Sequence, residues 1–207
     1  MLQNPPLRQA AKRYRQPWKN RTMKLNLEHL NFENHSRELI GLTISKVEYS
    51  EIDYDSKNST PYYSTHFRNL DSVDFSIFFH CNNNSIVEIF WDDKFFQFGL
   101  GIKINEPSDF SNSKKWDVSN NNLWKSFIGK TIIDIKVNWE TVTEEQAWKT
   151  QSFIYPQDIK INFSNNKNIF ISAAGFLNQN DSEVCGMLDN LTVTDDEDLA
   201  RKVKMII

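Results

Sequence analysis

Apolar and polar residues alternate with a period of two in several stretches of the chain. Residues 75–80 and 159–164 each place an apolar side chain at every second position, with polar side chains between them except at Phe78. This pattern is typical of a β-strand that buries one face. Apolar runs at 86–91 and 169–173 follow these stretches and predict partner strands.

Asparagine-rich segments separate the predicted strands. Asn82–Asn84 and Asn165–Asn166 each lie between a period-two stretch and the next apolar run. Asn tolerates the left-handed backbone that tight hairpin turns need. The segment 91–95, Trp-Asp-Asp-Lys-Phe, reads as a further hairpin turn. The strands are therefore expected to be mostly antiparallel.

Two short apolar-periodic stretches end in glycine. Residues 35–40 precede Gly41, and residues 122–128 precede Gly129. A glycine directly after a periodic stretch favours a helix C-cap, so each stretch predicts a short helix.

The C-terminus predicts the clearest helix, over 195–205. Thr194 and Glu197 have the spacing of a capping box, and acidic residues in a first turn complement the helix dipole. The apolar positions that follow form one stripe, which is expected to dock on a sheet: Leu199, Val203 and Ile206.

The order of predicted elements occurs twice. Residues 39–44, Leu-Ile-Gly-Leu-Thr-Ile, match residues 127–132, Phe-Ile-Gly-Lys-Thr-Ile, at an offset of 88 residues. Each copy continues with a strand, a long loop and a hairpin, which indicates two diverged repeats at about 35–106 and 122–193. The sequence therefore predicts a single α+β domain over 23–207, with a mostly antiparallel sheet and a C-terminal amphipathic helix. Whether the repeats share one sheet or form two stays open.

Three polar segments are expected to lack regular structure. Residues 107–122 read as the connector between the repeats. Residues 51–70 and 141–156 read as long loops at equivalent places in the two copies, and long loops on a sheet scaffold often carry binding residues.

Charge divides the chain into an arm and a body. Segment 1–22 contains six basic residues and no acidic residue. Residues 23–207 therefore carry 18 Lys and Arg against 27 Asp and Glu, a net charge of −9. The arm is expected to be disordered, and three roles stay open for it: a contact arm, an organellar presequence, or a tail without a function of its own. An acidic body disfavours nucleic acid as a partner.

Length and apolar pattern narrow the class of protein. A chain of 207 residues is long enough for one sizeable core, and no apolar run reaches the ~20 residues of a membrane helix. No apolar stretch follows the basic arm as in a secretory signal, and there are only two cysteines. We therefore expect a cytoplasmic protein that does not bind a membrane, of unknown oligomeric state.

Few residues point to catalysis. The four histidines lack metal-ligand spacing, although His80 and Cys81 are adjacent, and no Gly-x-Ser-x-Gly motif is present. Asp74 and Asp158 occupy matching places in the two copies and offer a carboxylate pair. We expect neither metal nor cofactor, and a protein that is not an enzyme.

The two predicted long loops combine aromatic and acidic residues. Aromatic anchors ringed by carboxylates suit a basic protein partner, because complementary charge speeds association and helps to exclude wrong partners. The candidate contact residues are Glu48, Glu51, Asp53, Asp55, Tyr62, Tyr63, Glu140, Glu144, Glu145 and Trp148.

The acidic, Asn-, Ile- and Phe-rich body from about Met23 onward resembles the immunity proteins of bacterial contact-dependent and polymorphic toxin systems. The Leu-Ile-Gly-x-Thr-Ile opening at 39–44 is similar to a recurrent start of small bacterial domains. The resemblance implies a cytoplasmic protein that neutralises one cognate toxin by covering its active site or an exosite.

Two other functions stay open from the residues alone. One is a small-ligand or carbohydrate-binding module that uses the loop aromatics. The other is a hydrolase that uses Asp74, Asp158 or His80.

Overall fold

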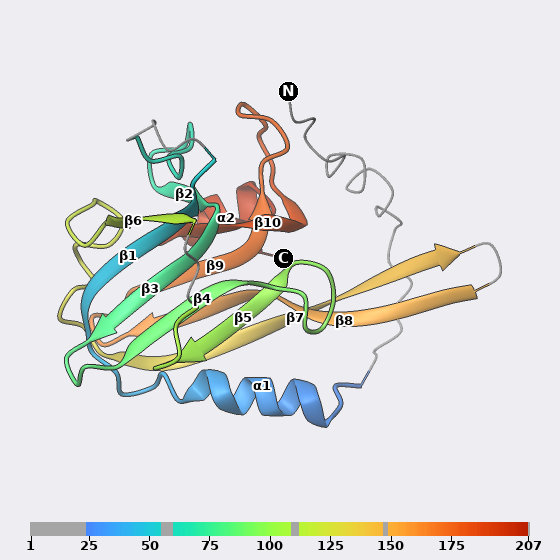
Figure 1. Ribbon diagram of the computed structural model, residues 1–207, viewed down its shortest axis with the longest axis horizontal. Coiled ribbons are helices and arrows are strands. Elements are labelled where there is room, and N and C mark those ends of the chain that lie inside the picture. The colour runs from blue at the N-terminus through green and yellow to red at the C-terminus, as the bar shows by residue number, and fades with distance from the viewer. Residues whose placement is uncertain (1–23, 55–59, 109–111, 147–148, 207) are drawn as a thin grey trace.

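A computed structural model describes residues 24–54, 60–108, 112–146 and 149–206 of the chain (Figure 1). In this part of the chain, ten strands form two five-stranded sheets, and every strand pairing is antiparallel. The predicted predominance of antiparallel sheet is confirmed, and the strands form two sheets rather than one.

The first sheet has the strand order β5-β4-β3-β1-β6. Its strands are β1 (Ile44–Ile52), β3 (Phe75–Cys81), β4 (Ile86–Asp92), β5 (Gly99–Ile104) and β6 (Ser113–Asp117). The second sheet has the order β2-β10-β9-β8-β7. Its strands are β2 (Leu70–Val73), β7 (Ile132–Gln146), β8 (Lys149–Phe163), β9 (Asn168–Gly175) and β10 (Cys185–Thr194).

The two sheets bury one apolar core between them. Each strand sends every second side chain inward, so the period of two in the sequence becomes one continuous apolar layer. The core side chains of the first sheet include Val47, Tyr49, Ile77, Phe79, Val87 and Ile89; those of the second include Ile135, Ile159, Ile161, Ile169, Ile171 and Val193. Trp124 and Phe127, which precede β7, are fully buried in the same core.

Helix α1 (Leu27–Arg37) runs along the lower side of the two sheets in Figure 1. Asn26 caps it, because its side chain accepts hydrogen bonds from the backbone N–H groups of Glu28 and His29 at 2.9 and 3.1 Å. The helix packs Phe32 edge-on against Phe95 and Trp139. These contacts attach the helix to the middle of β7 (Ile132–Gln146) and to the turn between β4 and β5.

Helix α2 (Glu197–Lys202) covers the outer face of the second sheet. Ala200 packs with Val203 and Met205 against Leu70 and Phe170 in a second, smaller apolar cluster. The predicted docking of the C-terminal apolar stripe on a sheet is confirmed, but the helix is shorter than the expected 195–205.

The start of helix α2 also differs from the prediction. Asp196 is the N-cap, and its side chain accepts from the Leu199 N–H at 2.9 Å. Thr194 is the last residue of β10, and its hydroxyl donates to the carbonyl of Asn69 at 2.6 Å. Pairing of β10 with β2 therefore overrides the local capping signal at Thr194.

The two matching glycine-containing segments contact each other. Thr43 and Thr131 form an antiparallel bridge, and their hydroxyls lie 2.8 Å apart. The Gly41 N–H donates to the Ile132 carbonyl at 2.9 Å, and the Gly129 N–H donates to the Ile44 carbonyl at 2.7 Å. The two bonds are reciprocal, because Gly129 is the repeat equivalent of Gly41 and Ile44 is the repeat equivalent of Ile132, each 88 residues apart. The two sheets therefore join through an arrangement with local two-fold character.

Several local predictions of helix and loop are wrong. Residues 122–128 form hydrogen-bonded turns, and the helix expected at 35–40 lies earlier, at Leu27–Arg37. The predicted connector 107–122 contains β6. The protein is thus more β-rich than the predicted α+β class, and long-range pairing explains it, because β6 is held by β1 rather than by its own pattern.

The predicted loop at 141–156 is the largest such error. Its described residues belong to β7 and β8, which pair along their length and project to the right in Figure 1. Polar residues such as Thr143 and Ser152 form cross-strand pairs there, with their hydroxyls 3.0 Å apart. The polar run at 143–146, Thr-Glu-Glu-Gln, interrupts the alternation of apolar and polar residues, which is why the pattern favours a loop.

Candidate functional site

The C-terminal end of β1 holds a buried carboxylate. Glu51 is only 1% exposed, and its Oε2 accepts a hydrogen bond from the Tyr62 N–H at 3.0 Å. Burial raises the pKa of Glu51 to about 7, although the Tyr62 N–H opposes the rise. The carboxylate therefore ties the segment around Tyr62 to the sheet at a cost in desolvation.

Two tyrosines next to Glu51 remain exposed. Tyr54 is 70% exposed and Tyr62 is 41% exposed. Tyr54 hydrogen-bonds to Asp74, and burial raises the pKa of Asp74 to about 6, with a further contribution from the charge of Asp189. Large apolar rings that project from anchored backbone offer contact area at a low entropic cost.

A further acidic residue borders these tyrosines. Asp53 forms an ion pair with Lys114 of β6 at 2.9 Å, and this pair fixes the chain just before Tyr54. We call Asp53, Tyr54, Tyr62 and Asp74 the tyrosine–carboxylate patch, with Glu51 as its buried support.

A polar hollow of about 380 Å³ adjoins the patch. We call it the Asp71 pocket. It lies where residues 63–71 face the turns at 120–123, and its lining residues are Tyr63, Ser64, Arg68, Asn69, Asp71, Asn120, Asn121, Asn122 and Leu123.

Asp71 is held from behind by two aromatic side chains. The Tyr49 hydroxyl donates to Asp71 Oδ2 at 3.0 Å, and the Trp124 indole N–H donates to the Tyr49 oxygen at 2.5 Å. Burial raises the pKa of Asp71 to about 6, and the Tyr49 hydrogen bond opposes this rise. Tyr49 lies in the core, so the pocket floor is rigid.

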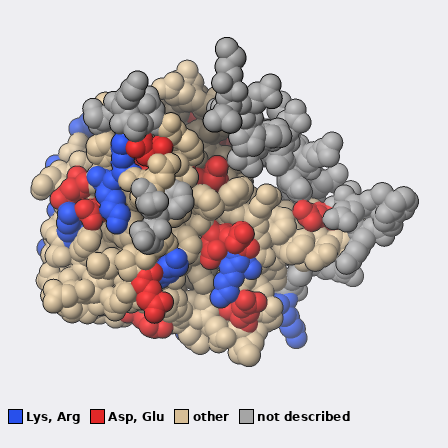
Figure 2. Space-filling view, in the orientation of Figure 1, with Lys and Arg blue, Asp and Glu red and all other residues tan. Residues whose placement is uncertain are grey.

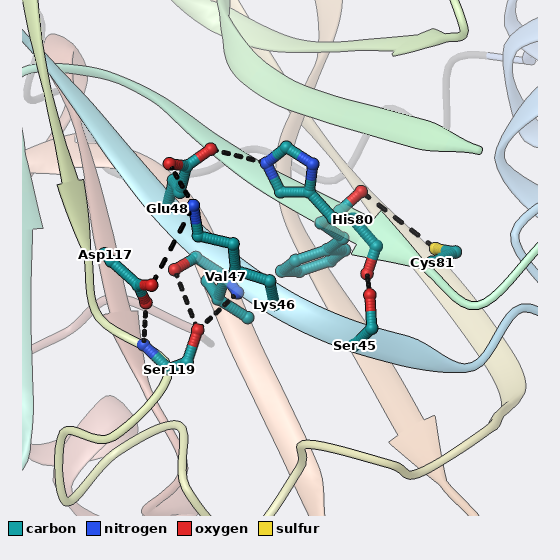
Figure 3. Close-up of polar contacts among 9 residues, drawn as sticks. Ser45, Lys46, Val47, Glu48, His80, Cys81, Asp117 and Ser119 are labelled. Carbon is teal, nitrogen blue, oxygen red and sulfur yellow. Dashed lines mark hydrogen bonds and ion pairs between the residues drawn. The ribbon is translucent and has the colours of Figure 1, made fainter. Parts of the chain in front are cut away.

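A second polar group lies on the outer face of the first sheet (Figure 3). Lys46 and His80 both contact Glu48, at 2.6 Å to Oε1 and 2.5 Å to Oε2. Lys46 also lies 3.8 Å from Asp117, whose carboxylate accepts from the Ser119 N–H at 3.0 Å. Burial raises the pKa of Glu48, but the two hydrogen bonds more than offset it and lower the pKa overall.

This second group forms a compensated ion network. An open hollow of about 570 Å³ beside it is lined by Lys46 and Lys125 as well as by Asp117, so neither sign of charge dominates. Glu48 was predicted as a contact residue, but its side chain is 16% exposed and already has two basic neighbours. It also points to the opposite face of the sheet from Glu51, because it is three residues away along the strand.

The predicted residues of the second loop lie elsewhere. Glu140 and Glu144 belong to β7, on the projecting hairpin. Tyr62 and Tyr63 belong to the segment between β1 and β2, which lies at the upper left of Figure 1. Burial raises the pKa of Glu140, against the effect of the Thr141 N–H. The structure thus does not bring the two sets of predicted residues onto one face.

Three predicted contact residues have no described side chain. Asp55 and Trp148 lie outside the described residues, and so does the side chain of Glu145. The basic arm over residues 1–22 also lies outside them.

The carboxylate pair expected of a hydrolase is not assembled. Asp158 on β8 lies in register with Ser172 of β9, Thr192 of β10 and Ser72 of β2. Three strand spacings amount to about 14 Å, and Asp74 lies two residues beyond Ser72. Glycosidases place their paired carboxyl groups about 5–9.5 Å apart. Asp158 instead accepts from Asn138 at 2.6 Å, and burial raises its pKa to about 7.

His80 and Cys81 also point to different environments. His80 contacts Glu48 on the outer face, whereas Cys81 is buried in the core and its thiol has a pKa raised to about 11 by burial. Within the described ranges, no group of three or more His, Cys, Asp and Glu side chains is arranged to hold a metal ion.

Charges on the visible face are distributed in small mixed groups. Figure 2 shows Asp and Glu next to Lys and Arg at several places, with uncharged surface between them. The acidic residues therefore do not form one continuous negative surface on this face. Partner binding here would depend on the charges around each site more than on the net charge of the chain.

Comparisons with known proteins give no relative. No family model, no curated protein and no solved structure matches the chain. In the described part of the chain, no helix is both long and apolar enough to cross a membrane.

Proposed function

We propose that the protein is a non-catalytic protein-binding domain that uses the tyrosine–carboxylate patch to bind a basic protein. The observation that carries the proposal is the exposure of Tyr54 and Tyr62 on backbone anchored by Glu51 and Asp53. Tyrosine is enriched among the residues that dominate binding energy, and rigid anchoring lowers the entropic cost of association.

The charge around these tyrosines favours a basic partner. Asp74 contacts Tyr54, and Glu51 and Asp71 lie behind Tyr62 and Tyr63. Carboxylates near an aromatic anchor attract a basic surface and repel acidic ones, which raises both the association rate and the specificity.

The partner class that best fits this chemistry is a toxin whose catalytic surface is basic, such as a nuclease. On this proposal the protein acts in the cytoplasm as an immunity protein and inhibits one cognate toxin by steric and electrostatic occlusion, without turnover. The proposed contact set takes Tyr62 and Tyr63 from the sequence-based candidates and adds Tyr54 and Asp74. Glu51 and Asp53, which were also predicted as contacts, act instead as the residues that anchor this segment.

Capture on the full-length chain tests this proposal. Immobilised wild-type protein is expected to retain a basic protein in a 1:1 ratio at low salt and to release it at high salt. The Tyr54→Ala/Tyr62→Ala variant is expected to lose it. The captured protein, assayed alone, is expected to have an activity that one equivalent of the wild-type chain abolishes.

Ile133→Ala is the matched control, because Ile133 is also a large exposed apolar side chain (50%) but lies at the start of β7. Retention of the same partner by the double tyrosine variant, or a partner whose activity is unaffected by the complex, would contradict the proposal.

We also propose that the two sheets descend from a duplicated unit. The support is the equivalent order β5-β4-β3-β1 and β10-β9-β8-β7, together with the reciprocal bonds of Gly41 and Gly129. Each unit then supplies one sheet, and the patch lies at the end of the first unit's sheet, where β2 crosses to the second.

A further inference from the structure

The Asp71 pocket combines one carboxylate and one exposed arginine at its rim, Arg68, with several neutral polar groups. Four of its nine lining residues are asparagines, and Ser64 and Tyr63 add hydroxyl groups. Asn121 donates its amide to the Tyr63 hydroxyl at 3.3 Å, which leaves the amide oxygen as an acceptor. The pocket is therefore rich in oxygen acceptors around a single acid.

Asp71 has an incomplete set of partners for a buried acid. Its described stabilising contact is the Tyr49 hydroxyl, and it forms no ion pair with a described Lys or Arg. Its side chain is partly exposed toward the hollow, so a cation from outside can reach it. A half-buried carboxylate without a cation is costly, and a bound cation would remove much of that cost.

We propose that the Asp71 pocket receives the guanidinium group of an arginine side chain from the partner protein. A guanidinium has five N–H donors in one plane, which match a carboxylate together with the surrounding amide and hydroxyl oxygens. The ring of Tyr63, which packs on Tyr49 with centroids 4.9 Å apart, offers a fixed aromatic wall for the cation. This proposal rests on the proposed function, since it names the group by which the basic partner is recognised.

Four titratable or charged groups face Asp71 and set the strength of the site. Tyr49 and Glu51 of β1 lie behind it, and Glu51 adds negative charge when it is ionised. Arg68 and Tyr63 come from the segment that forms the rim. Arg68 is exposed and carries the same charge as the proposed guest, so it opposes binding.

A titration with N-acetyl-arginine amide tests the pocket without the partner. The signal is the indole N–H resonance of Trp124, which reports on Asp71 through Tyr49. In the full-length protein this resonance is expected to shift with saturation. The neutral isostere N-acetyl-citrulline amide is expected to bind with at most a tenth of the affinity of the arginine probe.

Two variants are expected to change the affinity for the probe in opposite directions. Asp71→Asn should weaken it about tenfold or more through loss of the charge-assisted pair, and Arg68→Gln should strengthen it severalfold through removal of like charge. Asp93→Asn, at an exposed position in the β4–β5 turn, is the matched control and should leave the affinity unchanged.

The wild-type protein provides an internal check if Asp71→Asn disturbs Tyr49. Because the pKa of Asp71 is about 6, the probe should bind about tenfold more weakly at pH 5 than at pH 7.5. Equal binding of the citrulline probe, or an affinity that neither Asp71→Asn nor low pH reduces, would overturn the proposal.

Failure of the pocket is distinguishable from failure of the proposed function. If a partner is captured through Tyr54 and Tyr62 but the arginine probe does not bind, only the proposed arginine site is refuted. A probe that binds as expected while no basic partner is found refutes the proposed function and leaves the pocket as a cation-binding site.

Discussion

Glu51 was predicted as a partner contact, but the structure gives it a supporting role. Its sequence context predicts an exposed acid that meets a partner, but it is buried and holds the backbone of Tyr62. Its contribution to binding is therefore indirect, since it positions the tyrosine that the partner would contact.

Glu51→Gln is expected to stabilise the protein at pH 8 by about 1–3 kcal/mol. Gln keeps an oxygen acceptor for the Tyr62 N–H and removes a charge whose burial raises the pKa to about 7. At pH 4.5 the carboxyl is protonated in the folded protein, so the two proteins should be similar in stability. Urea unfolding at both pH values measures this, and a Gln variant that is less stable at pH 8 would contradict it.

The sequence identifies part of the patch and misses the rest for a physical reason. Tyr62 and Asp53 are detectable because aromatic and acidic residues cluster in one polar segment. Tyr54 directly follows Asp53 in the same segment, so the same signal could have identified it. Asp71 joins the site only because β2 pairs with β10 of the second sheet. Asp74 attracts attention only as a catalytic candidate, and its contact with Tyr54 is invisible in the sequence pattern.

At the scale of elements, two glycines fix the join between the sheets. Gly41 and Gly129 have φ values of +93° and +75°, and an added Cβ would meet no atom within 4 Å at either position. Gly41→Ala and Gly129→Ala should therefore each destabilise the protein by about 1–2 kcal/mol, through backbone strain alone. Thermal unfolding measures the loss of stability in each variant. Similar losses support the equivalence of the two segments, whereas an unchanged stability in either variant would speak against it.

The β7–β8 hairpin marks the limit of local sequence patterns. Its inner half is predicted, because Ile135 and Val137 alternate with polar residues. Its outer half mixes apolar residues such as Val142 and Ile154 with the polar run at 143–146 without a regular period, and its strand structure depends on the pairing of the two segments with each other. Partial burial of Phe153 against Phe96, with ring centroids 4.6 Å apart, supports that pairing from outside the hairpin.

At the scale of the whole molecule, several buried acids should make stability depend on pH. Burial raises the pKa of Glu51 and Asp158 to about 7 and of Asp71 and Asp74 to about 6. Between pH 4.5 and 7.5 the folded state therefore binds more protons than the unfolded state, and stability falls as the pH rises.

The free energy of unfolding should be lower at pH 8 than at pH 5 by at least about 2 kcal/mol. Glu48 and Asp117 have lowered pKa values and act in the opposite sense, but their effect is lost only at lower pH. Chemical unfolding across this range measures the slope. The Glu51→Gln/Asp158→Asn variant should flatten the curve, and a wild-type curve that rises toward pH 8 would be inconsistent with these burial effects.

The overall architecture is predictable in outline. Period-two strands, Asn turns and two glycine-containing segments are local features, and they predict antiparallel sheet and the C-terminal helix position. The pairing of β2 with β10 joins residues more than 100 positions apart, such as Val73 with Leu191. That pairing positions Asp71 and, directly after β2, Asp74, so this part of the site is less predictable than the fold.

The most direct test of the account is a calorimetric titration of the purified basic partner at two salt concentrations. It compares wild type with Tyr54→Ala/Tyr62→Ala at the patch and with Glu144→Gln on the β7–β8 hairpin. We predict 1:1 binding that weakens with salt, a loss of affinity of about 100-fold or more in the tyrosine variant, and little change in the hairpin variant. Full affinity in the tyrosine variant, or a large loss only in the hairpin variant, would contradict the assignment of the patch.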